Sequence, residues 1–541
     1  MKKENKFNHI ELFSGCGGLS LGLEKAGFEL LLANELSPMA AETFSYNFFN
    51  EDYQDLAKKD KKPKHSFWIS SKHEKLLPRL RENPFEYPEY ADKSSITDIP
   101  KNIKSLKGNL LIGNIIELNK LIESKEELRQ ALLSGFSRGG VDLVSGGPPC
   151  QGFSMAGLRE KDSDKNMLPW EFAKFVEYVQ PKIAVLENVT GILRAFKDND
   201  GKPFYAWFEV AKAFAEKKYI PLCLHVNARF AGVPQNRPRF IMIAIRSDIF
   251  EDIKSSFDSE SINYQLLSSS EKFYKLVQNN PDKAVMGTLE CYDPVKNISL
   301  FEGSFLHHLV GHDLVSVKEA LDDLKQTSPT ESSKFVESLN ETFSTVLLEH
   351  EKLSNHDHRS NGYHVQRRFR LYQVVQQSQS TAVRKEIFDI LKGDSCSLSD
   401  AVWEQVKGYE FLKDNNKIEC FDSKDSFIEY LRNHPTKKHS QKALDPNQPA
   451  PAALSIPDDA CHYDKNELRV LTVREMARIQ SFPDNFVFRS KVTTGGQMRK
   501  FEVPQYTQVG NAVPPLLGLA IGKVVTELLI QLTKDWWWHS G

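Results

Sequence analysis

The chain has 541 residues, of which 40% are hydrophobic, and its 70 basic and 72 acidic residues leave a net charge of -2. This length allows two or three domains with a substantial core, and the near neutrality excludes a protein whose whole surface attracts nucleic acid. Seven cysteines, scattered without a CxxC pair, argue against a disulfide scaffold and a zinc finger, so we predict a reducing compartment and no metal site.

The first 35 residues predict a strand, a Gly-rich turn, a helix and a second strand, which are HIELF (9–13), SGCGG (14–18), LSLGLEKAGF (19–28) and ELLLANE (29–35). This order is typical of a doubly wound α/β sheet. Backbone amides at such a turn suit a nucleotide or adenosyl cofactor, although a tight turn without a ligand has the same pattern. Ser20 occupies the third glycine position of the dinucleotide-binding motif, which argues against a dehydrogenase.

Residues 51–107 interrupt this alternation. They contain KKDKKPKH (58–65) and several prolines, and we predict an insertion with a solvated basic loop that faces DNA or a partner. Strands alternate with helices again at 109–115, 141–146, 182–189 and 239–245.

Residues 246–465 are polar, locally basic and without that alternation, and they end in a Pro- and Lys-rich stretch. We predict a separate, less regular domain inserted into the α/β domain, which would comprise residues 1–245 and a return segment, 466–541. Within the return segment, the apolar stretch 513–532 contains Pro514, Pro515, Lys523 and Glu527, which predicts a core helix instead of a membrane span. We therefore expect a soluble, cytoplasmic protein.

One cysteine stands out by its setting. Cys150 lies in GGPPCQGFS (146–154), on a stiff turn directly after the predicted strand 141–146. A free thiol has a pKa of about 8.5, so it needs a positive or hydrogen-bonding environment to become a nucleophile.

Polar side chains follow two further strands. Glu187 and Asn188 end the strand 182–189, and Arg237 and Arg239 lie two residues apart in PQNRPRF. Each alone could be a solvated acid or a surface arginine. Because consecutive strand ends of a parallel sheet meet at one edge, their order predicts a site shared with Cys150.

These motifs resemble the DNA (cytosine-5) methyltransferases of bacterial restriction–modification systems. The matching segments, which cover about half of the chain, are FSGCGGLSLGLEKAGF, ANE, GGPPCQGFS, ENV, PQNRPR, LTVREMARIQSFPDNF (471–486) and QVGNAVPPLLGLAIG (508–522). The resemblance implies an α/β fold, namely a Rossmann-like S-adenosylmethionine-dependent methyltransferase sheet with a less regular target-recognition domain at 246–465.

The resemblance also implies the chemistry. The Cys150 thiolate would add to C6 of a cytosine flipped out of the duplex, and C5 would then take the methyl group of S-adenosyl-L-methionine, which leaves S-adenosyl-L-homocysteine. Glu187 would hydrogen-bond N3 and the exocyclic amine, and Arg239 would reach O2. Arg237 and Asn188 belong to the same catalytic set.

For the cofactor, the resemblance implies that Phe13 packs on adenine, that the glycine turn holds the methionine part and that Glu35 binds ribose. Asn114 stands where the family usually has an aspartate near the adenine amine, and Asp98 is an alternative for that position. The full set of predicted cofactor residues is Phe13, Gly15, Cys16, Gly17, Gly18, Glu35, Asn114, Ile115, Pro148, Asn511 and Ala512.

Candidate DNA contacts lie in the loop 151–166, which we expect to close over the flipped base, and in the target-recognition domain. They are Gln151, Ser154, Arg367, Arg368, Arg370, Lys437 and Lys438. The segment YHVQRRFRLYQ (363–373) also fits a helix that packs by Phe369 and Tyr372.

The expected partners are double-stranded DNA and, where one exists, a separate cognate restriction endonuclease, and we expect a DNA-associated monomer in a prokaryotic cytoplasm without membrane contact. Two alternatives remain: a tRNA cytosine-5 methyltransferase on the same scaffold, and a catalytically silent DNA-binding regulator.

Overall fold

The computed structural model describes residues 7–149, 167–197, 203–347, 353–436, 441–452 and 454–538, with side chains of the last segment described through residue 533. At its centre is a nine-stranded sheet in the order β11-β9-β10-β6-β5-β1-β2-β4-β3. The strands are β1 (Phe7–Leu12), β2 (Phe28–Glu35), β3 (Ser66–Trp68), β4 (Asn109–Ile112), β5 (Leu143–Gly146), β6 (Ile183–Val189), β9 (Tyr219–Asn227), β10 (Pro238–Arg246) and β11 (Cys291–Tyr292).

The order of the strands creates a switch point at the middle of the sheet. From β1 the chain runs outward through β2 to β4 and then returns to β5 and β6 on the other side of β1, all parallel. Strand β10 lies antiparallel between β6 and β9. Ligands of open α/β sheets bind at the carboxyl ends of the strands where the direction of winding reverses, here beside β1 and β5. The predicted doubly wound α/β sheet is confirmed.

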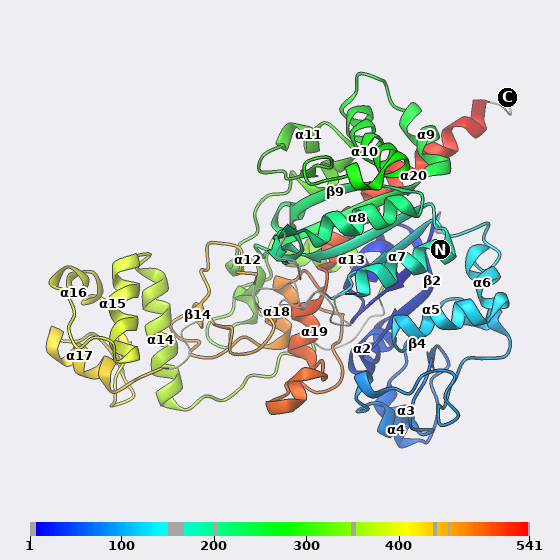
Figure 1. Cartoon of the computed structure of the whole chain (residues 1–541). Helices are drawn as coiled ribbons and strands as arrows, with labels where there is room; N and C mark the ends of the chain where they lie inside the picture. Colours follow the sequence, from blue (N-terminus) through cyan, green and yellow to red (C-terminus); the bar gives the residue numbers. More distant parts are fainter. Residues whose placement is uncertain are drawn as a thin grey trace.

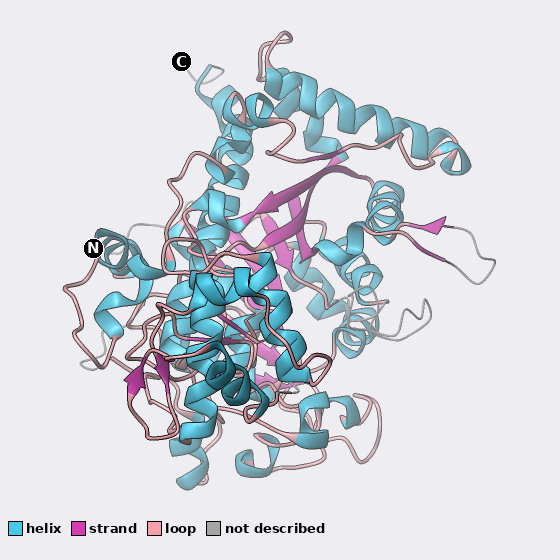
Figure 2. Ribbon diagram, turned by 90° about the vertical axis from the view of Figure 1, so that its left-hand side faces the viewer, coloured by secondary structure: helices cyan, strands magenta, loops and turns pink. Residues whose placement is uncertain are grey.

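Helices cover both faces of the sheet, whose strands carry almost continuous apolar residues (Figure 2). One face packs on α5 (Ile115–Ser124), α6 (Glu126–Leu133), α7 (Leu168–Val179) and α8 (Ala206–Glu216). The other packs on α1 (Gly18–Lys25), α9 (Ser247–Ser255) and α20 (Pro515–Trp538), and α10 (Ile262–Asn279) contributes to the cores on both faces. Further out, α2 (Pro38–Phe49) covers β4.

The first and last helices of the chain pack closely. A Cβ atom added to Gly22 of α1 would lie 2.3 Å from the Leu519 backbone nitrogen of α20. The part of α20 from Pro515 to Thr533 is long and apolar enough to cross a membrane by length and composition, but 56% of it is buried inside the protein. Its apolar residues face α1 and the sheet, as we predicted for a core helix.

The segment 51–107 extends the sheet and then runs along its edge. It contains α3 (Tyr53–Lys58), α4 (Leu76–Arg79) and β3, which pairs with β4. The lysines of its basic loop are exposed, as expected, and this part lies below the sheet in Figure 1.

Residues 246–465 divide into a part that packs on the sheet and a part with its own core. Strand β11 pairs with β9 in the sheet, and helices α9 and α10 pack against it. A separate lobe, seen at the left of Figure 1, is built from α14 (Tyr363–Gln377), α15 (Thr381–Lys392), α16 (Asp400–Val406) and α17 (Lys424–Arg432). Short strand pairs accompany them, β12 (Phe411–Leu412) with β13 (Ile418–Glu419) and β14 (Lys442–Ala443) with β15 (Ala460–Cys461).

Between the lobe and the sheet lie α12 (Val317–Leu321), α13 (Lys334–Phe343), α18 (Val473–Ile479) and α19 (Gln505–Asn511), which share one core. Helix α11 (Ile298–Glu302) packs on the core beside the sheet. The helix alternative for 363–373 is correct, because α14 buries Phe369 and Tyr372 in the lobe's core. The domain boundary at residue 246 stays a prediction, and the packing of α9 and α10 favours a later one.

Candidate active site

A cavity of about 650 Å³ opens at the carboxyl ends of β1, β2, β4, β5 and β6. Its volume lies within the range of small-molecule sites. It brings together most of the residues that the sequence singled out, namely Phe13, Gly15, Cys16, Gly18, Glu35, Asn114, Ile115, Pro148, Glu187, Asn188, Arg237, Arg239, Asn511 and Ala512.

The Gly-rich turn after β1 is shaped by close packing. Phe13 and Gly15 have left-handed backbone conformations, with φ of 55° and 56°. At Gly17, which is not among the residues that line the cavity, a Cβ atom would lie 2.4 Å from Phe48 of α2. Burial raises the pKa of the Cys16 thiol, whose Sγ lies 3.7 Å from the Gln508 carbonyl oxygen. The thiol of Cys16 therefore ties the turn to α19 and is no nucleophile.

Glu35 joins the turn to the next element of the sheet. Its carboxylate accepts hydrogen bonds from the Ser37 amide at 2.7 Å and from the Gly15 amide at 2.8 Å. Burial raises the pKa of Glu35, and these hydrogen bonds partly offset the effect. Since a carboxylate accepts up to about four hydrogen bonds, Glu35 can also accept from ribose hydroxyls.

The position after β4 distinguishes the two candidates for the adenine contact. Asn114 lines the cavity, and its Oδ1 accepts from the Ile116 amide at 3.0 Å, which caps α5. Asp98 pairs with Arg79 and, at 3.0 Å, with Lys62, and it is not among the described residues around the cavity. The structure places Asn114 at the site and assigns Asp98 to the packing of the insertion.

Glu187 and Arg239 form a buried ion pair on the other side of β1. Arg239 Nε lies 2.7 Å from Glu187 Oε1, and each residue is 8% exposed. Burial lowers the pKa of Arg239, and the Glu187 carboxylate counteracts this. A Cβ atom added to Gly147 would lie 2.8 Å from Glu187 Oε2, so the close approach of this carboxylate to the backbone at residue 147 depends on the glycine.

Asn188 holds the turn that leads to the predicted nucleophile. Its Nδ2 donates to the Pro148 carbonyl at 2.9 Å, and its Oδ1 accepts from the Val189 amide at 2.8 Å. Cys150 itself lies outside the described residues, as do Gln151 and Ser154.

Arg237 joins β10 to the return segment. Its Nη2 donates to the carbonyls of Gly510 at 2.7 Å and Ala512 at 3.0 Å, and burial lowers its pKa well below the ordinary range. Because its guanidinium is buried against backbone carbonyls, Arg237 fits a positioning residue better than the catalytic role predicted for it.

Comparison with known proteins agrees with this geometry. The family model for the C-5 cytosine-specific DNA methylase matches residues 7–77 and 112–527. The chain belongs to this family. It is therefore a DNA (cytosine-5) methyltransferase, and the α/β methyltransferase fold and the activity expected from the motifs are confirmed.

Among the relatives of this methyltransferase, M.DdeI of Desulfomicrobium norvegicum is 26% identical and aligns with 96% of this chain and 88% of its own. M.Bpa9945I of Bacillus paralicheniformis is also 26% identical, with 96% and 98% covered. M1.HphI of Haemophilus parahaemolyticus is 25% identical, with 96% and 87% covered. All three are named Type II methyltransferases.

The cavity of the methyltransferase contains two groups that sequence reasoning missed. Glu11 of β1 accepts a hydrogen bond from the Ser20 hydroxyl, and burial raises its pKa to about 8. The sequence could have indicated Glu11, because it is an acidic residue within an apolar strand, just before the Gly-rich turn. Phe85 and Tyr87 of the insertion also line the cavity, and no pattern marks them.

The structure of the lobe changes which residues remain candidates for DNA contacts. Arg370 is only 3% exposed and donates to the Glu410 carbonyl at 2.8 Å, so its prediction as a DNA contact is not supported. Arg367 donates to Asn416 at 2.9 Å within the lobe, whereas Arg368 is half-buried and remains a candidate. Lys437 and Lys438 lie outside the described residues.

A second cleft, of about 480 Å³, shares Asn511 with the cavity. Arg359 and Arg499 line it together with Thr493, Thr494 and Thr507. Arginine and threonine side chains are common phosphate and base contacts, and sequence reasoning singled out neither arginine.

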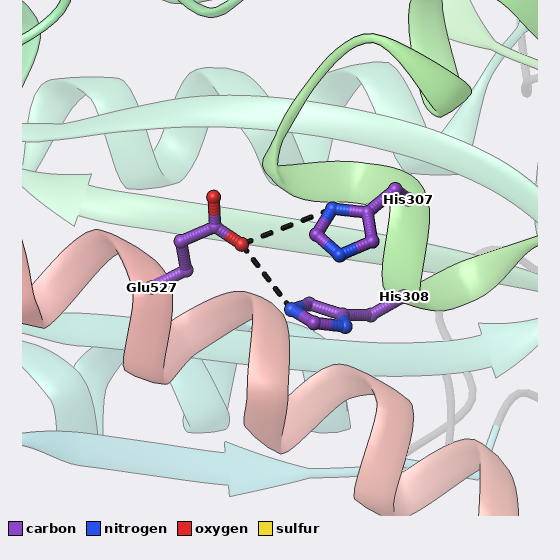
Figure 3. A group of neighbouring side chains, drawn as sticks. All are labelled: His307, His308 and Glu527. Atoms are coloured by element: carbon purple, nitrogen blue, oxygen red, sulfur yellow. Dashed lines mark ion pairs between the residues drawn. The ribbon is translucent and has the colours of Figure 1, made fainter.

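A group of titratable side chains lies away from both clefts, where His307 and His308 of the 3-10 helix η8 (Phe305–Leu309) face Glu527 of α20 (Figure 3). Their ligand atoms lie within 4.8 Å of one another, which is close enough for a metal ion, although the sequence predicts none. However, His308 Nε2 already lies 3.2 Å from the carboxylate, and Lys523 adds a positive charge. We interpret the group as polar contacts that join η8 to α20.

Proposed function

We propose that the enzyme methylates C5 of a cytosine flipped out of a specific duplex DNA sequence, with S-adenosyl-L-methionine as methyl donor and a covalent Cys150–C6 adduct. The observation that carries this proposal is the buried Glu187–Arg239 pair at the cavity end that also receives the Pro148 turn. Flipping is required because C5 and C6 are not accessible to a side chain inside the stacked duplex.

The residues of the cavity fit the methyl donor. The Glu35 carboxyl group can accept hydrogen bonds from a ribose, and the cavity is large enough for an adenosyl group. Glu35 would bind the ribose hydroxyls, Phe13 and Ile115 the adenine, and the turn around Gly15 the methionine part. When bound, the donor supplies a methyl group on a sulfonium, which leaves S-adenosyl-L-homocysteine.

The protein's own groups would carry the reaction on cytosine. The Cys150 thiolate attacks C6, and the electron pair of the C5–C6 double bond then makes C5 nucleophilic. Glu187 accepts a hydrogen bond from the exocyclic amine and, in its protonated form, donates one to N3, while Arg239 donates to O2, where negative charge develops. After C5 has gained the methyl group, a water molecule takes the C5 proton, the C5–C6 double bond re-forms, and the C6–S bond breaks to release the Cys150 thiolate.

Asn188 and Arg237 would act through other groups. Asn188 fixes the carbonyl of Pro148 and thereby the stiff turn that presents Cys150, which lowers the orientational entropy lost at attack. Arg237 fixes the return segment, where Asn511 and Ala512 complete the cavity wall.

We further propose a catalytic domain of residues 1–245 and 466–541, on which α9 and α10 also pack, and a target-recognition domain within residues 246–465. A DNA-associated monomer in a bacterial cytoplasm, beside a separate cognate endonuclease, is consistent with the Type II methyltransferases that the chain resembles.

The first test is base-resolution mapping of 5-methylcytosine in plasmid DNA from cells that express the chain, beside Cys150→Ala. We expect one recurring methylated motif with the wild type and none with the variant, which should still bind S-adenosyl-L-homocysteine. Unmethylated DNA from soluble wild type, together with labelled methyl transfer to tRNA, would favour the RNA alternative. Unmethylated DNA and tRNA would leave the silent regulator.

A further inference from the structure

The insertion reaches the cavity. Pro84, Phe85, Tyr87 and Glu89 are among the residues that line it. The family model matches residues 7–77 and resumes at 112, so this piece of the cavity wall comes from a segment outside the match. Phe85 of this segment is 53% exposed, although it borders a partly apolar cavity.

The segment is fixed on the side of the cavity next to β4. The Tyr90 amide donates to Glu117 of α5 at 2.8 Å, and Lys125 lies 5.3 Å from the centre of the Tyr90 ring. Helix α5 starts directly after β4, where Asn114 and Ile115 line the cavity. At the other end, Arg79 pairs with Asp98, and Tyr87 packs on the core that contains Trp68 of β3.

This anchoring decides which part of a bound ligand the segment can contact. Glu187 is on β6, four strands from β4 in the sheet. With neighbouring strands about 4.8 Å apart, the two sides of the cavity are separated by roughly 19 Å. A ligand whose reactive group lies near Glu187 and whose ribose lies at Glu35 extends its purine toward β4.

We propose that residues 84–89 form an adenosine subsite that the insertion adds to the cavity, with the Phe85 and Tyr87 rings packing on the purine and ribose of the methyl donor. The subsite rests on the proposed use of S-adenosyl-L-methionine. It gives the insertion a role in cofactor affinity that is independent of its exposed basic loop, for which the sequence predicts contact with DNA or a partner.

The test is calorimetric binding of S-adenosyl-L-homocysteine to the full-length protein, its Phe85→Ala and Phe85→Tyr variants, and Leu77→Ala as matched control. Leu77 is an apolar residue of the same insertion, 60% exposed and not among the residues around the cavity. Stacking of a base on an aromatic ring contributes about 1–3 kcal/mol, so Phe85→Ala should bind about tenfold more weakly. Phe85→Tyr and Leu77→Ala should bind like the wild type.

In Phe85→Ala the KM for S-adenosyl-L-methionine should rise about tenfold while kcat falls much less, because the ring is remote from the reacting atoms. 5′-Methylthioadenosine, which lacks the amino acid part of the cofactor, should also bind about tenfold more weakly to Phe85→Ala than to the wild type. Unchanged affinity in Phe85→Ala, with the wild type binding normally, overturns the subsite alone. A wild type that binds no S-adenosyl-L-homocysteine overturns the proposed cofactor, and the subsite with it.

Discussion

Arg239 Nε lies 2.7 Å from Glu187 Oε1, and the two residues come from the neighbouring antiparallel strands β10 and β6. Each charge is buried and compensated by the other. Such a pair contributes little net stability, but either partner alone is costly, because it leaves an uncompensated buried charge. The pair therefore holds the Glu187 carboxyl group in a fixed position at the place where cytosine is proposed to bind.

Arg239→Met should lower the free energy of unfolding by about 3–5 kcal/mol, since Glu187 then loses its partner. The double variant with Glu187→Gln should recover part of that loss but no methyl transfer. Glu187→Gln alone should reduce kcat by about 10²-fold or more, comparable to the loss of one transition-state hydrogen bond. Urea unfolding and labelled methyl transfer measure the two effects, and an Arg239→Met protein as stable as the wild type would contradict the first.

Asn188→Ala removes the donor to the Pro148 carbonyl. We expect kcat to fall by about 10–100-fold, because a small displacement of a reacting group is costly, while the Kd for S-adenosyl-L-homocysteine stays within about threefold. The rate at which iodoacetamide alkylates Cys150 should also change in Asn188→Ala. This rate would stay the same if Asn188 only stabilised another part of the fold. A normal kcat with an altered cofactor affinity is the opposite result and would refute this assignment.

Arg237→Lys tests whether this guanidinium acts in chemistry or in positioning. A lysine cannot reproduce the two hydrogen bonds from one planar group to Gly510 and Ala512, so we expect a loss of about 2–3 kcal/mol in stability. Well below the midpoint of thermal unfolding, kcat should remain within about threefold of the wild type. A large loss of kcat at unchanged stability would instead place Arg237 on the substrate.

Glu11 should make the stability depend on pH. Burial raises its pKa from 4.5 to about 8, so between these values the folded protein binds more protons than the unfolded chain. This contribution to stability is complete below pH 4.5 and is lost as the pH rises to about 8, with an upper bound of about 5 kcal/mol. From pH 5 to pH 8, the free energy of unfolding measured with urea should decrease less for Glu11→Gln than for the wild type. Equal decreases would mean that Glu11 is ionised in the folded protein.

The strands β1, β2, β4, β5, β6 and β10 could be predicted because each is an apolar stretch bounded by turn residues. The motifs at their carboxyl ends then predicted the residues around the cavity. Strand β9 was missed although its sequence, YIPLCLHVN, is equally apolar. Its place beside an antiparallel β10 depends on tertiary pairing, which no local pattern records.

Two other features depend on tertiary packing in the same way. Arg370 stands in a basic segment that is typical of a DNA contact, yet α14 buries it against the Glu410 carbonyl. Phe85 stands in a Pro-rich stretch without periodicity, and it reaches the cavity only because β3 and the Tyr90–Glu117 hydrogen bond fix the insertion along the sheet edge.

The packing of α20 on α1 has a consequence for how the enzyme is made. The apolar residues Leu19 and Leu23 of α1 are covered by a helix that begins at Pro515, almost 500 residues later. During synthesis the ribosome delivers the glycine turn early, but its covering helix and the wall at Asn511 arrive last. A nascent or truncated chain therefore lacks a complete cavity wall, so we expect methylation only from chains that have been translated through α20.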